Sequence, residues 1–305
     1  MDLFTPPPQD EPVAASPPPV PLAEVPLYKV DLVDVLLVFI AAVGSIIFCV
    51  GVGTIAMLIV RSPRPLDARE LATNALFVIP MQVVAYLMVI GFMAFIVWVR
   101  HERTLMDAIS WNPPPTRLAL AALGAGAILG LCSELSSGLL QRWTPKSLPI
   151  DEYFRNPSAA YLLAAFGVLI APLVEELFFR GFLFPAVARW TGTVSAILIT
   201  AAAFAALHGT QLAYAWAPLL VLFGIGIVLT VVRVKTCSVA TCVIVHMGYN
   251  LTLFIMLFFG TDHFRHLERA ELDSPTKKLL RYELNGQQRT RTASQPAGGK
   301  LLPPG

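Results

Sequence analysis

Long uncharged blocks alternate with short polar connections along most of the chain. A helix needs about 20 predominantly apolar residues to cross the hydrocarbon core of a bilayer. The pattern therefore predicts an all-α fold, a polytopic membrane helix bundle of about seven transmembrane helices. The blocks are Val35–Val60, Ala75–Val99, Leu118–Leu140, Ser158–Arg189, the shorter Val194–Leu207, Ala213–Val232 and Val239–Phe259.

The composition supports this interpretation. The chain is 56% hydrophobic and only 14% charged, whereas soluble proteins carry about 25% charged residues. We therefore expect a multi-pass integral membrane protein, in the plasma or inner membrane if the host is prokaryotic. The net charge of +2 favours no particular partner; we expect membrane lipids around the protein and no nucleic acid.

The blocks and their connections suggest four parts. Residues 1–30 form a Pro-rich tail that we expect to be disordered, without the positive n-region of a signal peptide. Residues 31–140 hold three transmembrane helices, 158–260 form a core, and 261–305 form a polar tail. The four cysteines lie in or beside apolar blocks without C-x-x-C spacing, so we expect packed thiols. They are Cys49, Cys132, Cys237 and Cys242.

Several ionisable residues lie inside the apolar blocks of the core. Each costs about 2.5–3.5 kcal/mol at the centre of a membrane helix, and together they would cost on the order of 10 kcal/mol or more if they faced lipid. They must therefore face one another or a wet cavity. They are Glu175, Glu176, Arg180, His208 and His246; the other histidines, His101, His263 and His266, lie in polar segments and are expected to be solvated.

Helical spacing sorts these residues. Glu176 and Arg180 are i, i+4 and can pair on one face, whereas Glu175 points about 100° away from Glu176 and lacks that partner. His246 and Asn250 also share one face. A carboxylate and a histidine can deprotonate a water, and a second histidine with an amide can stabilise an oxyanion. The set therefore indicates peptide hydrolysis without a covalent nucleophile.

Three short motifs follow one another on successive apolar blocks. Glu175–Phe182 begins with E-E-x-x-x-R, Phe204–His208 reads F-x-x-x-H, and His246–Asn250 reads H-x-x-x-N. In this order they resemble the CAAX protease and bacteriocin-processing family, and within it the type II CAAX prenyl endopeptidases. The resemblance covers about Tyr161–Phe259 and implies an intramembrane CAAX-protease-like core.

The resemblance also implies a role for each polar residue of the motifs. Zinc sites in enzymes use about three protein ligands and an open position, which Glu175, His208 and His246 could supply. Whether a divalent metal such as zinc takes part therefore stays undecided, although we favour a glutamate-activated water without obligatory zinc. The implied roles are Glu175 as general base, His208 as its partner, His246 and Asn250 as oxyanion donors, and Glu176 and Arg180 as structural support.

These inferences predict a metalloprotease-like, glutamate-dependent intramembrane endopeptidase, acting on a membrane-associated or prenylated peptide or protein. Three alternatives stay open. The polar residues could hold helices together through buried hydrogen bonds. The chain could also be a catalytically inactive scaffold or self-immunity protein of the same fold. A transporter with a proton relay is disfavoured, because the chain shows no pair of similar halves with interrupted helices.

Overall fold

The computed structural model describes residues 30–61, 74–154 and 156–265, and this part of the chain is helical without a strand. The predicted all-α class is therefore confirmed. The predicted tails 1–30 and 261–305 lie almost wholly outside the described residues. The elements are α1 (Leu32–Arg61), α3 (Ala75–His101), α4 (Leu105–Ala108), α5 (Thr116–Leu139), η1 (Gln141–Trp143), η2 (Pro149–Phe154), α6 (Pro157–Ala165), η3 (Phe166–Ile170), α7 (Ala171–Glu176), η4 (Leu177–Leu183), α8 (Phe184–Thr191), α9 (Thr193–Leu207), α10 (Trp216–Thr236) and α11 (Val239–Gly260).

Within the described ranges, six helices are long and apolar enough to cross a membrane: α1, α3, α5, the continuous helix Pro157–Thr191, α10 and α11. The seventh predicted span, α9, has 15 residues, or about 22 Å at about 1.5 Å per residue, against about 30 Å of hydrocarbon. Gly192, with a φ of +79°, separates it from α8. The chain is thus a multi-pass integral membrane protein in which α9 is too short to span alone.

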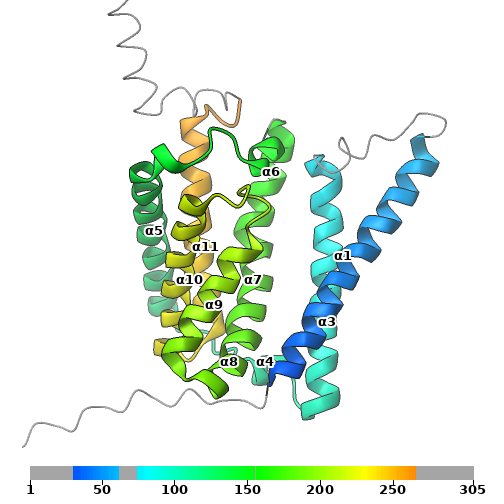
Figure 1. Cartoon of the computed structure of the whole chain (residues 1–305), viewed down its shortest axis with the longest axis vertical. Coiled ribbons are helices and arrows are strands. Elements are labelled where there is room, and N and C mark those ends of the chain that lie inside the picture. Colours follow the sequence, from blue (N-terminus) through cyan, green and yellow to red (C-terminus); the bar gives the residue numbers. More distant parts are fainter. Residues whose placement is uncertain (1–29, 62–73, 155, 266–305) are drawn as a thin grey trace, which may run out of the picture.

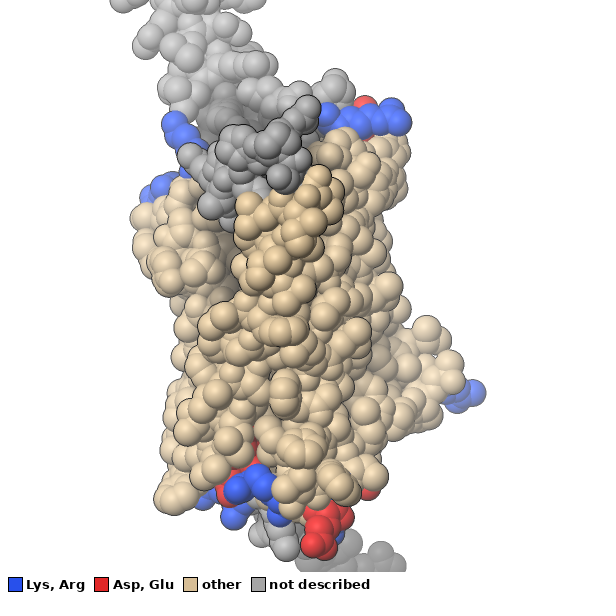
Figure 2. Space-filling view, turned by 90° about the vertical axis from the view of Figure 1, so that its right-hand side faces the viewer, with Lys and Arg blue, Asp and Glu red and all other residues tan. Residues whose placement is uncertain are grey.

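The surface matches a membrane environment. Figure 2 shows Lys, Arg, Asp and Glu gathered toward the two ends of the molecule, with a broad band of other side chains between them. Large apolar side chains on the long helices are exposed, among them Ile47 at 67% and Leu87 at 64%. In water such a surface would drive aggregation, so these side chains contact lipid.

The helices form a bundle with a hairpin at its side. Figure 1 shows α1 and α3 beside each other on one side and the helices from α5 to α11 on the other. Within the bundle, α5 and α11 approach so closely that a Cβ at Gly126 would overlap the carbonyl oxygen of Val245. A Cβ at Gly248 would lie 2.5 Å from the carbonyl oxygen of Leu123. Small residues permit such close helix contacts in membranes.

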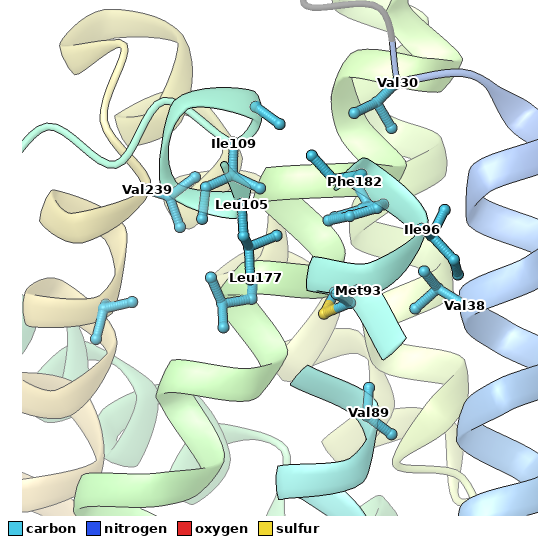
Figure 3. Packing of buried hydrophobic residues seen from close by; sticks show 13 residues of the cluster. Val30, Val38, Val89, Met93, Ile96, Leu105, Ile109, Leu177, Phe182 and Val239 are labelled. Carbon is cyan, nitrogen blue, oxygen red and sulfur yellow. The ribbon is translucent and has the colours of Figure 1, made fainter. Parts of the chain in front are cut away.

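An apolar cluster fastens the hairpin to the rest of the bundle. Val38 of α1 and Met93 of α3 pack with Ile109, Leu177 and Phe182, all 0–1% exposed. Figure 3 shows these side chains converging from the helices around them. Because Leu177 and Phe182 belong to η4, the cluster supports the helix that carries the two glutamates.

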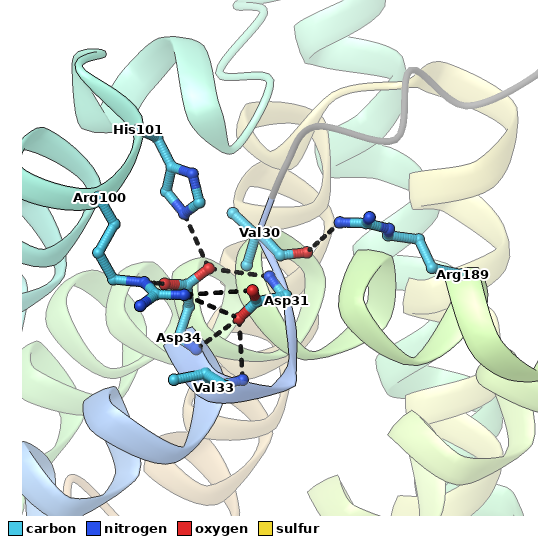
Figure 4. A network of polar contacts seen from close by, with 7 residues as sticks. All are labelled: Val30, Asp31, Val33, Asp34, Arg100, His101 and Arg189. Atoms are coloured by element: carbon cyan, nitrogen blue, oxygen red, sulfur yellow. Dashed lines mark hydrogen bonds and ion pairs between the residues drawn. The ribbon is translucent and has the colours of Figure 1, made fainter.

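A polar network lies where the described chain begins (Figure 4). Asp34, 0% exposed, accepts hydrogen bonds from Nε of Arg100 at 2.6 Å and Nε2 of His101 at 2.8 Å. Arg189 donates to the carbonyl oxygen of Val30 at 3.4 Å. Burial raises the pKa of the nearby Asp31 carboxyl, but hydrogen bonds from the Asp34 and Val33 amides and the Arg100 charge outweigh it and leave the pKa lowered.

This network corrects one expectation. His101 was predicted to be a solvated loop residue, but it is the last residue of α3 and its side chain is 9% exposed. The helix continues past its apolar block because Asp34 offers the ring a buried partner. His263 is half-exposed beside Asp262, as expected, and His266 lies outside the described residues.

Candidate active site

One long helix carries both glutamates, and it is irregular on either side of them. The helix Pro157–Thr191 contains two π-helical segments, η3 and η4, with α7 between them. π-Turns are rare and occur frequently at functional sites. Glu175 and Glu176 are the last two residues of α7. The two glutamates therefore lie where α7 meets the second π-helical segment.

Glu176 is the buried centre of the site. Its side chain is 0% exposed, and Oε1 accepts hydrogen bonds from Nη1 of Arg180 and Nδ1 of His246, both at 2.8 Å. The predicted i, i+4 pair is therefore present. Arg180 also donates from Nη2 to the carbonyl oxygen of Gly226 at 3.1 Å. Such additional hydrogen bonds are needed, because the attraction within a buried ion pair alone rarely offsets its desolvation.

The contact with Glu176 fixes the orientation of the His246 ring. Because Nδ1 donates its proton to the carboxylate, Nε2 is the nitrogen left for other partners. This Nε2 lies 3.9 Å from Oε2 of Glu175, which is too long for a direct hydrogen bond. A polar pair separated by more than about 3.5 Å is commonly bridged by a water. The space between Glu175 and His246 is therefore suited to a water or a polar substrate group.

A contact through Nδ1 also fixes the orientation of the His208 ring. It is the C-cap of α9, and its Nδ1 contacts the carbonyl oxygen of Phe204 at 2.9 Å, which leaves Nε2 available. The Phe204 ring lies 4.9 Å from the His208 ring and 5.8 Å from the His246 ring, between centroids. The Arg180 guanidinium carbon lies 4.9 Å from the same ring. The phenylalanine of the second motif therefore positions both histidines, a role that spacing alone did not reveal.

Asn250 reaches the backbone of η3. Its Nδ2 donates a hydrogen bond to the carbonyl oxygen of Gly167. One amide hydrogen is thus used within the protein, and the other remains for a ligand. The residue was predicted to act beside His246, and the structure adds this contact with the long helix.

The six predicted residues form two layers. Glu176, Arg180 and His246 are buried, whereas Glu175, His208 and Asn250 are partly exposed. Hydrogen bonds and ring contacts hold the buried layer together, and it supports the outer one. Only the partly exposed layer and Nε2 of His246 are therefore placed to meet a substrate.

The side chains do not fit a metal site as they lie. In the described part of the chain, no three His, Cys, Asp or Glu side chains group closely enough to hold an ion. Zinc needs about three protein ligands in one coordination sphere, and Glu175, His208 and His246 do not converge to that degree.

Comparison with known proteins agrees with the motifs. Residues 157–252 match the family model described as Rce1-like, type II CAAX prenyl endopeptidase Rce1-like. The match starts at the first residue of α6 and ends two residues beyond Asn250, so it includes every residue of both layers. No curated protein and no solved structure matches the chain significantly. Residues 157–252 of this membrane protein are thus similar to the Rce1-like family of type II CAAX prenyl endopeptidases.

Proposed function

We propose that the chain is an intramembrane endopeptidase in which Glu175 and His208 activate the attacking water. The observation that carries the proposal is the difference between the two adjacent glutamates. Glu176 is buried and held by Arg180 and His246, whereas the Glu175 side chain is 19% exposed and faces the free nitrogen of His246. Glu175 is therefore the carboxylate available to take a proton from water.

The proposed reaction uses these side chains in turn. Glu175 accepts a proton from a water that also contacts Nε2 of His208, and the resulting hydroxide attacks the peptide carbonyl carbon. Protonated His246 donates Nε2–H to the oxyanion while its Nδ1–H stays on Glu176, and the second amide hydrogen of Asn250 is a further donor. Glu175 then passes its proton to the leaving amine as the C–N bond breaks. Loss of one such oxyanion donor costs about 100- to 1,000-fold in kcat.

The substrate class is proposed from the family name and the location of the site. The description of the matching family names type II CAAX prenyl endopeptidases. The reacting groups also lie on apolar helices with lipid-facing surfaces. We propose a peptide that is anchored beside the site by a prenyl chain, since the bilayer then supplies the peptide at high local concentration. Matched peptides with and without the prenyl group test this: a rate ratio near one contradicts a lipidated substrate.

The first experiment identifies natural cleavages. Membranes containing the wild type, Glu175→Gln or His246→Ala at matched expression are analysed by mass spectrometry of terminal peptides. New termini that appear with the wild type and with neither variant support a protease and identify its substrates. Identical profiles from three folded proteins would contradict the proposal and favour the inactive scaffold or self-immunity alternative.

A further inference from the structure

Each π-helical segment is followed by a proline, one residue beyond the donor of its last irregular hydrogen bond. At η3, the amide of Ala171 donates to the carbonyl oxygen of Phe166, five residues back. The next amide in this register would serve the carbonyl oxygen of Gly167. The next residue is Pro172, which has no N–H. The Gly167 carbonyl therefore lacks a backbone donor from this register.

The second segment repeats the arrangement. At η4, the amide of Phe184 donates to the carbonyl oxygen of Phe179, again five residues back. The next amide would serve the carbonyl oxygen of Arg180, but the next residue is Pro185. Two carbonyl groups on either side of the glutamates thus lose their helical partners to prolines. A buried carbonyl left unsatisfied is costly, so each needs a donor from elsewhere.

Side chains from α10 and α11 supply both donors. Nδ2 of Asn250 donates to Gly167, as described above. Nε of Arg233 donates to the carbonyl oxygen of Arg180 at 3.3 Å, and the Arg233 side chain belongs to a residue only 1% exposed. Arg233 follows the predicted apolar block Ala213–Val232, but the structure places it in the last turn of α10, where its side chain points into the protein.

Arg233 and Arg180 each donate a side-chain hydrogen bond to the backbone of the helix that carries the other. The Arg180 side chain donates to the carbonyl oxygen of Gly226 in α10, and Arg233 of α10 donates to the carbonyl oxygen of Arg180 in η4. Nη2 of Arg233 also donates to the carbonyl oxygen of Ile109 at 3.4 Å. Ile109 belongs to the same apolar cluster as Leu177 and Phe182 of η4 (Figure 3).

We propose that Arg233 is a positioning residue of the active site. It replaces the amide hydrogen that Pro185 removes, and it thereby fixes η4 in the register that aims Arg180 at Glu176. Asn250 performs the same task at η3, where Pro172 removes the hydrogen. Arg233 touches no reacting atom, and its effect on cleavage rests on the proposed function, whereas its pairing with Pro185 does not.

Restoring the lost amide tests the proposal. Arg233→Met removes the donors and keeps an unbranched side chain. Because η4 then loses its register, kcat falls roughly tenfold to a hundredfold with KM little changed. Pro185→Ala returns an N–H beside the Arg180 carbonyl, so the double variant recovers part of kcat and of the melting temperature. Pro172→Ala returns an N–H to the other segment and is the matched control, because it should not rescue Arg233→Met.

The outcomes separate the inference from the proposed function. Rescue by Pro185→Ala alone supports it; rescue by both prolines, by neither, or by Pro172→Ala alone overturns it. If Arg233→Met does not fold, Arg233→Lys replaces it and is combined with the same two proline variants. Lysine keeps the charge but lacks the fixed fork of donors of arginine. If the wild type cleaves no peptide, the proposed function fails, and the melting temperatures of the same variants in detergent still decide the pairing of Arg233 with Pro185.

Discussion

The buried pair Glu176–Arg180 gives a prediction whose size follows from its contacts. Arg180→Met removes the hydrogen bond from Nη1 to Glu176 and the one from Nη2 to Gly226, and both side chains of the pair are 0% exposed. The Glu176 carboxylate then keeps His246 as its neighbour without the arginine charge. Breaking a buried ion pair on one side commonly costs about 3–5 kcal/mol. At about 2–4 °C per kcal/mol, the melting temperature in detergent should fall by about 6–20 °C.

The control is the same substitution at an exposed arginine. Arg142 lies over the Trp143 ring at 3.6 Å from its centroid, a contact worth about 0.5–1 kcal/mol when exposed, so Arg142→Met should change the melting temperature little. Adding Glu176→Gln to Arg180→Met removes the unpaired charge and should recover part of the loss. Equal melting temperatures for Arg180→Met and Arg142→Met, or a double variant less stable than the sum of its parts, would refute this reasoning.

Three further predictions concern packing, pH and metal. Gly126→Ala should destabilise the protein by about 1–3 kcal/mol through overpacking, because its Cβ would overlap the Val245 carbonyl; Gly124→Ala, with nothing within 4 Å, should not. The lowered pKa of Asp31 means that the ionised carboxyl stabilises the fold above its ordinary pKa of 3.8 and that this contribution disappears as pH falls through the lower folded value. Asp31→Asn should therefore lower the melting temperature at neutral pH, with a difference from wild type that shrinks well below pH 3.8. Preincubation with a zinc chelator should leave the cleavage rate unchanged, and a loss that added zinc restores would contradict a metal-free site.

The spacing of residues along the chain predicted most of the residues of the site but few of the contacts between them. The pair Glu176–Arg180 follows from i, i+4 geometry within one helix, so the sequence was sufficient. The contact of Glu176 with His246 joins residues 70 positions apart, and no local pattern specifies which carboxylate the ring will meet. Until that contact is known, the two glutamates differ only in their arginine neighbour.

Two prolines mark the irregular segments in the sequence, but the spacing of the polar residues does not reveal their effect. Pro172 and Pro185 interrupt an apolar block long enough to be a simple span, and each removes an amide that a regular helix needs. Their consequence depends on donors from distant helices, Asn250 and Arg233, which only the folded structure identifies. Helix α3 also extends beyond its predicted apolar block to His101. The apolar pattern reports contact with lipid, and it does not reveal the buried Asp34 carboxylate that the His101 ring contacts.

The most direct measurement is single-turnover cleavage by purified protein in liposomes. A prenylated peptide identified by terminal profiling is incubated with the wild type, Glu175→Gln and Glu175→Asp, after the variants are shown to melt within a few degrees of the wild type. The account predicts cleavage by the wild type and a loss of roughly 100-fold or more for Glu175→Gln, because general-base catalysis contributes about 10²–10⁴-fold. Cleavage by Glu175→Gln at the wild-type rate would contradict it.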